Sequence, residues 1–403
     1  MIDHEEARGL VLSAVRALRA ETVRLADAPG RTLARDIRAR EDVPPFTKAT
    51  MDGYAVRADD TRPAGGSAAV ELEVIADLAA GRFSRKPVGP GRAVRIMTGA
   101  PLPKGADAVV MVEDTAKRGA RVEVRRAVRA GDNIGRAGED LRKGEIVIER
   151  GVVIGPAETG MLAAAGLRRV PVVRRPKLAV IATGDEIVEP GERKRPGQIR
   201  NSNGPALLAL ARRAGAEAEY LGIARDRNSS LGLLIGRAKD ADILVLTGGV
   251  SVGDHDLVKD ELSAAGVRPV FWRVRIKPGK PVFFGRRGRQ LAFGLPGNPT
   301  SAMVTFILFV RPALDGLLGR KMPGPAGGRA ILGEDIVLKP GRKQFLRAVL
   351  DGGGPVLKVV PYPDQRSGVL RSMARSRVLL VVPADASRLE KGREVEILYM
   401  DGR

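Results

Sequence analysis

The pattern of hydrophobic positions changes character along the chain. Ala7, Leu10, Val11, Ala14 and Leu18 recur at helical spacing behind an acidic capping segment at 3–6, which predicts one amphipathic helix at the start. From about residue 42 to 140, short β-branched runs alternate with Gly/Pro turns, a pattern typical of an all-β unit. Strands are expected at 70–75, 93–97, 108–112 and 122–124. A second helix is expected from 156 to 166. If the two helical segments pack together, the β unit is an insertion between them.

From residue 174 the pattern becomes strand, glycine loop and helix, repeated. Apolar strands are expected at 177–182, 218–224 and 242–246, and helices at 205–214, 254–265 and 302–314. Mostly apolar strands that alternate with helices predict a parallel sheet covered on both faces. The longest apolar run, 303–310, is far too short to cross a bilayer and indicates a buried helix. Residues 320–328 are rich in Gly, Pro and basic residues and predict a linker to a small β domain.

The composition limits the chemistry that this chain can perform. It has no cysteine and only two histidines, His4 and His255. Disulfides, thiolate zinc sites and cysteine nucleophiles are excluded, and a multi-histidine site is nearly so. Both histidines are expected to be solvated, His4 at a helix start and His255 in a loop. Catalysis must therefore use carboxylates, lysines, backbone amides and a hard metal ion.

The charge points to anionic partners. Lys and Arg number 68 against 47 Asp and Glu, a net charge of +21, which favours phosphorylated metabolites, oxyanions or nucleic acid. The basic residues are spread along the chain and only 3% of residues are aromatic, so nucleic-acid binding is disfavoured. The acidic start, with no apolar segment behind it, predicts a cytoplasmic protein that makes no membrane contact.

Candidate chemistry concentrates where the parallel strands end, because ligands of open parallel sheets bind beyond the carboxyl ends of the strands. That edge carries three loops, each with a carboxylate: Glu186, Asp226 and Asp256. Capping of helices is the plainer interpretation of acidic residues there. Three carboxylates at one edge favour a Mg²⁺ site that bridges phosphates, while glycine-rich loops let backbone amides approach the phosphates. The loop residues are Thr183, Gly184, Gly248, Gly249 and Ser251.

Two further segments suit an anion. Lys277 and Lys280 lie on a Pro/Gly turn that holds two point charges at nearly fixed separation, although most such lysine pairs only decorate a surface. The loop 294–301, stiffened by Pro296 and Pro299, directs backbone amides and the Ser301 hydroxyl one way. The β unit contributes turns at Asp52, Thr98 and Asp140 that would not be taken for a site by themselves.

Taken in order, seven strings resemble one family, the bacterial and archaeal molybdopterin molybdenumtransferases and the catalytic domain of gephyrin. They are Pro45-Phe46 with Met51-Asp-Gly-Tyr-Ala-Val56, Ile96-Met-Thr-Gly-Ala-Pro101, Gly138-Glu-Asp140, Ala182-Thr-Gly-Asp-Glu186, Thr247-Gly-Gly-Val-Ser-Val-Gly253, Lys277-Pro-Gly-Lys-Pro281 and Leu295-Pro-Gly-Asn-Pro299. The resemblance covers nearly the whole chain.

The resemblance implies a multidomain α/β plus β fold with four domains. Domain I, helical and mixed, would hold 1–41 and 141–173, and the inserted β domain II would hold 42–140. Domain III, doubly wound and molybdopterin-binding, would hold 174–321, and a β-barrel-like domain IV would hold 322–403. The family also implies a homodimer whose active-site cleft draws on both subunits, with a molybdopterin adenylyltransferase as a possible partner.

The resemblance also assigns roles. The cleft would be lined by Asp52, Thr98, Asp140, Glu186, Asp226, Asp256, Lys277, Lys280, Pro296 and Pro299, with Ser301, Arg347 and Ser367 helping to hold molybdate. The implied reaction cleaves the phosphoanhydride of adenylated molybdopterin, releases AMP and loads molybdenum onto the dithiolene. Mg²⁺ on Glu186, Asp226 and Asp256 would neutralise phosphate charge.

Some positions depart from the family pattern, and other functions compete. Ala49 replaces a frequent serine, Arg366 replaces a glycine, and 374–376 differ; the last two changes lie in the fourth domain with Arg347 and Ser367. Tungstate could replace molybdate, since the two oxyanions have nearly the same size and charge. The chain could instead adenylate molybdopterin, or act as a scaffold or nucleic-acid-binding protein.

Overall fold

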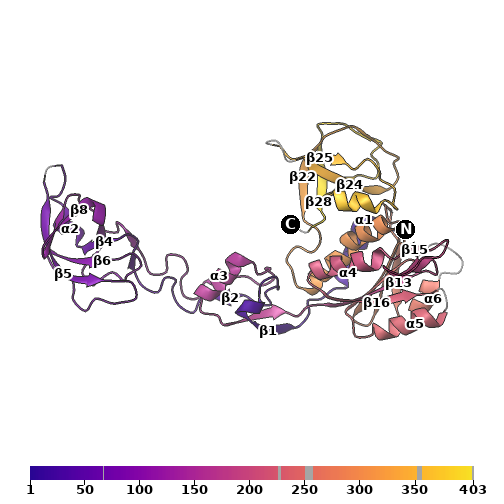
Figure 1. Ribbon diagram of the computed structural model, residues 1–403, viewed down its shortest axis with the longest axis horizontal. Helices are drawn as coiled ribbons and strands as arrows, with labels where there is room; N and C mark the ends of the chain where they lie inside the picture. Colours follow the sequence, from indigo (N-terminus) through magenta and orange to yellow (C-terminus); the bar gives the residue numbers. More distant parts are fainter. Residues whose placement is uncertain (67, 226–227, 250–256, 352–355, 402–403) are drawn as a thin grey trace.

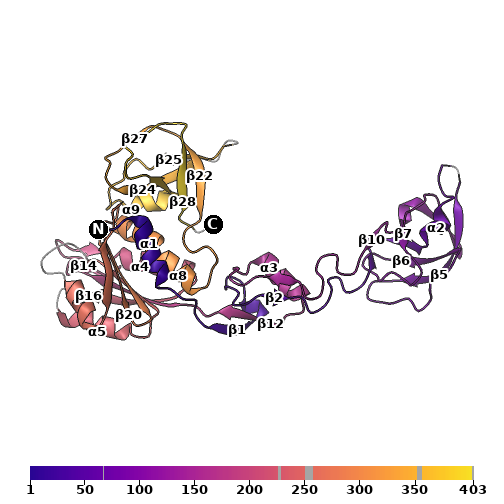
Figure 2. The same cartoon turned by 180° about the vertical axis from the view of Figure 1, so that it is seen from behind.

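Four units follow one another along an elongated molecule in the computed structural model (Figure 1). The structure describes residues 1–403 except 67, 226–227, 250–256, 352–355 and 402–403. An all-β unit lies at one end, a small mixed unit lies next to it, and an α/β unit lies beside a second β unit at the other end. The view from behind shows both termini at that second end (Figure 2). The chain thus runs out to the far β unit and returns.

The far β unit is built on an open six-stranded sheet covered on both faces. All four residues of β4 (Gly53–Val56) are buried, with Tyr54 and Val56 in one apolar cluster and Ala55 in another, because successive side chains of a strand point to opposite faces. The expected strands are confirmed. The sheet order is β7-β4-β6-β5-β9-β8, with β5 (Val70–Leu78), β6 (Arg92–Ile96), β7 (Ala108–Met111), β8 (Thr115–Arg118) and β9 (Arg121–Val124), besides α2 (Ala58–Thr61) and η2 (Val112–Asp114).

The small mixed unit joins two segments that are far apart in the sequence. β1 (Ala20–Arg24) pairs antiparallel with β12 (Arg169–Val173), and β2 (Ile37–Arg38) pairs with β11 (Ile146–Ile148). α3 (Pro156–Ala164) places Leu162 in the same apolar cluster as Leu33 and Val172. β3 (Lys48–Ala49) and β10 (Ile134–Gly135) pair at the base of the far β unit, and η1 (Leu25–Asp27) follows β1. The far β unit is therefore a long excursion between the two halves of this unit.

The first helix packs elsewhere than the sequence suggested. α1 (His4–Ser13) buries Ala7 and Val11 in the core of the α/β unit, and the Leu18 amide donates to the Leu317 carbonyl at 2.8 Å. The expected packing of the two helical segments on each other is wrong. α3 is short and covers its own sheet, while the apolar face of α1 finds a larger apolar partner in the helix 299–317.

The docking of α1 also buries His4, against expectation. Its side chain is only 11% exposed and its ring lies 5.7 Å from the ring of Phe309 and 5.0 Å from that of Phe345. Burial lowers the pKa of His4, and the nearby charge of Lys343 lowers it further. His4 is thus a neutral packing residue rather than a solvated one.

The α/β unit contains a mixed six-stranded sheet of order β16-β13-β17-β21-β20-β18. The four strands β13 (Lys177–Thr183), β16 (Glu217–Ala224), β17 (Ile243–Thr247) and β21 (Gln290–Leu295) are parallel. The expected parallel strands at 177–182, 218–224 and 242–246 are confirmed. β20 (Pro281–Arg287) and β18 (Arg268–Arg273) add an antiparallel pair at one edge of the sheet. α5 (Asn228–Arg237) and α6 (Leu257–Ala264) cover one face, α4 (Asn203–Arg213) lies on the other, and β14 (Ile187–Val188) pairs with β15 (Ile199–Arg200).

One long helix forms the centre of this core. It consists of α7 (Pro299–Thr305), a π-helical turn η3 (Phe306–Val310) and α8 (Arg311–Leu317). Its 19 residues are long and apolar enough to cross a membrane by composition alone, but 83% of the window is buried inside the protein. The prediction of a buried core helix is confirmed.

The C-terminal unit is a closed five-stranded barrel, as expected. β24 (Lys343–Asp351), β25 (Lys358–Pro361), β22 (Gly327–Leu332), β28 (Glu394–Tyr399) and β26 (Val378–Val382) follow in that order, and β26 pairs back with β24. Each of these five strands therefore pairs with a neighbour on both sides. From the α/β unit, β19 (Ile276–Lys277) pairs with β24 and so couples the barrel to that unit. β23 (Ile336–Val337) pairs with β27 (Arg388–Leu389), and α9 (Leu370–Arg375) lies between β25 and β26.

Candidate active site

The loops that follow three neighbouring parallel strands interlock. Gly248, after β17, has a φ of +93°, and a Cβ there would lie 2.5 Å from the carbonyl oxygen of Thr183 at the end of β13. Its amide donates to the Leu295 carbonyl at the end of β21 at 3.2 Å. Only glycine meets both demands, the left-handed backbone and the close approach. The sequence prediction that Thr183 and Gly248 share one edge of the sheet is confirmed.

Asn203 ties these loops together and was missed from the sequence. It is the first residue of α4 and is buried, at 7% exposure. Its Nδ2 donates to Thr247 Oγ1 and to the Gly297 carbonyl, both at 2.8 Å. Its Oδ1 is buried and has no hydrogen-bond partner within the described part of the chain. An asparagine at a helix start resembles an ordinary cap, so only the fold reveals this role.

Glu186 belongs to the same edge. Gly184 has a φ of +138°, and a Cβ there would lie 2.5 Å from Glu186 Oε2, so the carboxylate folds back over the end of β13. Asp226, Ser251, His255 and Asp256 lie outside the described residues. Within the residues that are described, no group of three acidic or histidine side chains is arranged to hold a metal ion.

The lysine turn rests on the core helix beside this edge. Lys277 and Lys280 are exposed, whereas Pro278 and Gly279 between them are buried. Gly279 has a φ of +100° and lies directly against the Thr305 methyl group, and Thr305 Oγ1 donates to the Ser301 carbonyl at 2.7 Å. The turn is thus anchored through its glycine, which leaves both ammonium groups in solvent. Ser301 itself is buried, at 4% exposure.

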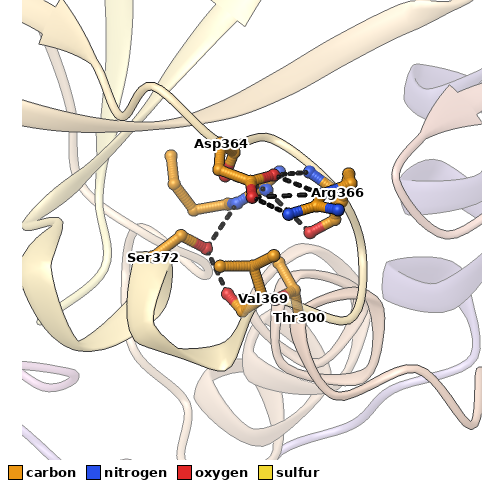
Figure 3. Close-up of polar contacts among 6 residues, drawn as sticks. Thr300, Asp364, Arg366, Val369 and Ser372 are labelled. Carbon is orange, nitrogen blue, oxygen red and sulfur yellow. Dashed lines mark hydrogen bonds and ion pairs between the residues drawn. The ribbon is translucent and has the colours of Figure 1, made fainter.

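A barrel loop closes onto the start of α7. Asn298 Nδ2 donates to Ser367 Oγ at 3.0 Å, and the Thr300 amide donates to the Ser367 carbonyl at 3.2 Å. Thr300 Oγ1 also reaches the Val369 carbonyl at 3.2 Å (Figure 3). The predicted neighbours Pro299, Ser301 and Ser367 are therefore brought together, with Pro296 buried just before them.

Arg347 stabilises the barrel loop that carries Ser367. It is almost fully buried, at 1% exposure, and donates to Ser372 Oγ at 3.1 Å and to the Arg366 carbonyl at 3.2 Å. Burial lowers its pKa to about 10. Arg366, which replaces a glycine of the family pattern, points outward and pairs with Asp364 (Figure 3). That pairing holds the pKa of Asp364 at about 2, and the replacement leaves the contacts of Arg347 intact.

The remaining predicted residues form a second, separate group. Thr98 donates to Asp52 Oδ1 from both its hydroxyl and its amide at 2.7 Å, and the two bonds lower the pKa of Asp52. Asp140 is exposed in the connection back to the mixed unit. Asp52 directly precedes β4 and Thr98 follows β6, at the β-unit end of the molecule, whereas Glu186 follows β13 and Lys277 precedes β20, at the other end (Figures 1 and 2). One chain by itself does not bring the two groups together.

Comparison with known proteins matches this architecture over most of the chain. The family model "MoeA N-terminal region (domain I and II)" matches residues 2–166, "Probable molybdopterin binding domain" matches 179–316, and "MoeA C-terminal region (domain IV)" matches 329–400. The α/β domain and its loop edge thus define the chain as a multidomain protein with a molybdopterin-binding type of domain.

Relatives over nearly the whole chain specify the family. The molybdopterin molybdenumtransferase of Bacillus subtilis is 38% identical over 94% of this chain and 90% of its own length. Molybdopterin molybdenumtransferase 2 of Mycobacterium tuberculosis is 38% identical over 98% of both chains. The structure of a molybdopterin biosynthesis moeA protein from Pyrococcus horikoshii superposes with a TM-score of 0.86 at 34% identity, covering 99% of this chain and all of the other. The chain belongs to the molybdopterin molybdenumtransferase family, the transferases of molybdenum insertion in cofactor biosynthesis.

Proposed function

We propose that this chain transfers molybdate to adenylated molybdopterin and releases AMP in a Mg²⁺-dependent step. The observation that carries the proposal is the junction of the interlocked strand-end loops, the exposed lysine turn and the Ser367 loop around the start of α7. This junction combines backbone amides, hydroxyls and cations, which are the donors that phosphates and oxyanions require.

Each group has a task in this proposal. The glycine-rich loops at Gly184 and Gly248 receive the phosphates, because backbone without a side chain can approach them closely. Lys277 and Lys280 attract the molybdate dianion, and the Ser301 and Ser367 region orients it. Arg347 is a positioning residue, since its donors are engaged by the loop that carries Ser367.

The donor set suits a hard cation. Glu186 offers a carboxylate beside the strand end, and the sequence adds Asp226 and Asp256. Oxygen ligands of this kind are those that Mg²⁺ prefers, and the ion would supply neutralisation of the phosphate charge.

We further propose that the active site is shared within a homodimer. Asp52, Thr98 and Asp140 are too far along the molecule to meet Glu186 and Lys277 of the same chain (Figure 1). In a two-fold dimer the β unit of one subunit can reach the strand-end loops of the other. We place this enzyme in the cytoplasm, with a molybdopterin adenylyltransferase as supplier of its substrate.

Binding of the oxyanion tests the role of the lysines. Lys277→Gln and Lys280→Gln should each weaken molybdate binding by on the order of tenfold, as expected for loss of one charged donor. Lys239→Gln, an exposed lysine of the same unit, is the matched control. Tungstate in a parallel titration compares the two oxyanions. Unchanged molybdate affinity in both variants would remove the lysine turn from the site.

Mixed dimers test the shared site. Asp52→Asn and Glu186→Gln subunits are each expected to be inactive in AMP release from adenylated molybdopterin with Mg²⁺ and molybdate. After mixing and random exchange, half of the dimers are mixed, and one of the two sites in each mixed dimer is intact. Activity should therefore return to about a quarter of wild type. No recovery, despite verified exchange, contradicts the shared site. Incubation with molybdopterin and ATP tests the adenylation alternative, which predicts AMP transfer to the pterin.

A further inference from the structure

A second pocket lies at the opposite edge of the same sheet from the candidate active site. Lys177 begins β13 and Asp242 directly precedes β17, whereas Thr183 and Thr247 end those strands at the active-site edge. The length of β13 separates the two edges by about 20 Å. The pocket has a volume of about 810 Å³, within the range of about 300–1,000 Å³ typical of sites for small molecules.

The lining of this pocket is strongly basic. Six cationic side chains and two carboxylates line it, an excess of four positive charges. The cations come from three segments: Arg16 and Arg19 after α1, Arg174 and Lys177 at the start of β13, and Arg286 and Arg289 on the β20–β21 hairpin. Segments far apart in the sequence thus bring like charges to one concave surface, which costs free energy unless an anion is present.

One carboxylate of the pocket is already neutralised. Arg174 holds Asp242 through two hydrogen bonds of 2.9 and 2.7 Å, and the Lys177 amide donates to the same carboxylate at 2.8 Å. This pairing fixes one wall of the pocket.

The remaining arginines are available to a ligand. Within the described part of the chain, Arg16, Arg19, Arg286 and Arg289 form no ion pair with a carboxylate. Arg213, which is exposed on another surface, pairs with Asp401 at 2.6 Å.

We infer that this pocket binds a polyphosphate chain, either free or as the triphosphate of a nucleotide. A triphosphate carries roughly three to four negative charges at neutral pH, which matches the excess in the lining. Guanidinium groups bind phosphate oxygens in pairs of hydrogen bonds. Among the described residues that line the pocket, none is aromatic and able to stack on a base, so recognition rests on the phosphates. This assignment is independent of the proposed transferase reaction.

Calorimetric titration at about 150 mM salt tests the assignment. Sodium tripolyphosphate and ATP should bind with similar affinity, and AMP at least about tenfold more weakly, because it offers one phosphate. The double variant Arg286→Ser/Arg289→Ser should lose on the order of tenfold or more in tripolyphosphate affinity. Arg82→Ser/Arg85→Ser, which removes the same charge from exposed sites in the far β unit, should stay within about twofold of wild type.

Three outcomes would overturn the inference. The first is equal affinity of wild type and the Arg286/Arg289 variant, and the second is an equal loss in the control, which would reveal only overall charge. The third is a variant that still binds tripolyphosphate but has a changed oligomeric state in analytical ultracentrifugation. That result would show that this surface is a subunit interface. AMP release by the variant should match wild type, since the pocket lies at the other edge of the sheet.

Discussion

The buried carboxylate of Asp315 allows a quantitative prediction about stability. Its side chain is 2% exposed in α8. It accepts from Arg311 Nε at 2.8 Å, from Arg320 Nη1, and from the Gly324 amide at 3.0 Å. One carboxylate therefore joins the core helix to the segment that leads into the barrel.

Asp315→Ala removes the acceptor and leaves three donors facing one another. Breaking a buried charge pair by deleting one partner costs about 3–5 kcal/mol. Because Arg311 and Arg320 keep 16% and 14% of their side chains exposed, they recover some hydration, and we expect the lower end, about 3 kcal/mol. Asp315→Asn keeps the shape and one acceptor, so its cost should be smaller, about 1–2 kcal/mol.

The single tryptophan makes the measurement specific to this unit. Trp272 lies in β18 with its ring 4.7 Å from that of Phe283, so its fluorescence follows unfolding of the α/β unit during denaturant titration. Glu219→Gln, an exposed position on β16, should change the free energy of unfolding by less than about 0.5 kcal/mol. A loss below about 1 kcal/mol for Asp315→Ala would refute the argument that this network stabilises the junction.

Three further predictions concern single groups. The lowered pKa of His4 means that the unfolded chain binds a proton near pH 6.5 while the folded chain does not. The free energy of unfolding is thus full above that pH and falls below it, by up to about 1 kcal/mol at pH 5.5. Denaturant titrations followed by Trp fluorescence, one above pH 6.5 and one at pH 5.5, should show this loss, and His4→Leu should abolish it. Thr98→Val removes the hydroxyl that contributes most to the low pKa of Asp52, so the carboxyl titration seen by ¹³C NMR should move upward; an unchanged midpoint would contradict the assignment. Gly279→Ala forces a Cβ against Thr305 at a φ of +100° and should cost about 1–3 kcal/mol, with partial rescue by Thr305→Ser; equal stability of the single variant and wild type would argue against the strained turn.

The sequence predicted the strands and core helix well because their signals are local. The run from Leu178 to Ala182 is continuously apolar, as is typical of a strand that is buried on both faces. Strand direction has no such local signal, so the antiparallel edge strands β18 and β20 could not be predicted. Helical periodicity likewise shows that α1 has an apolar face but not which surface covers it, which explains the errors over α1 and His4.

The sequence revealed the motifs of the candidate site but not the contacts that hold them together. Gly184 and Gly248 were recognisable as glycines that follow strands, and the structure adds that both have a positive φ. Asn203 was missed because its function depends on Thr247 and Gly297, which lie 44 and 94 residues away in sequence. The roles of Asp226 and Asp256 stay predictions, as both lie outside the described residues.

The π-helical turn at Phe306–Val310 fixes an angle between two parts of the protein. Each residue of an α-helix rotates the chain by about 100°, and a π turn absorbs one extra residue without breaking the helix. Ser301 and Thr305 before the turn are therefore out of phase with Asp315 and Leu317 after it. Deleting one residue from 306–310 would restore a regular helix and rotate the lysine-supporting segment by about 100° relative to the barrel anchor. The number of residues in this short stretch thus sets how the two ends of the helix are oriented relative to each other.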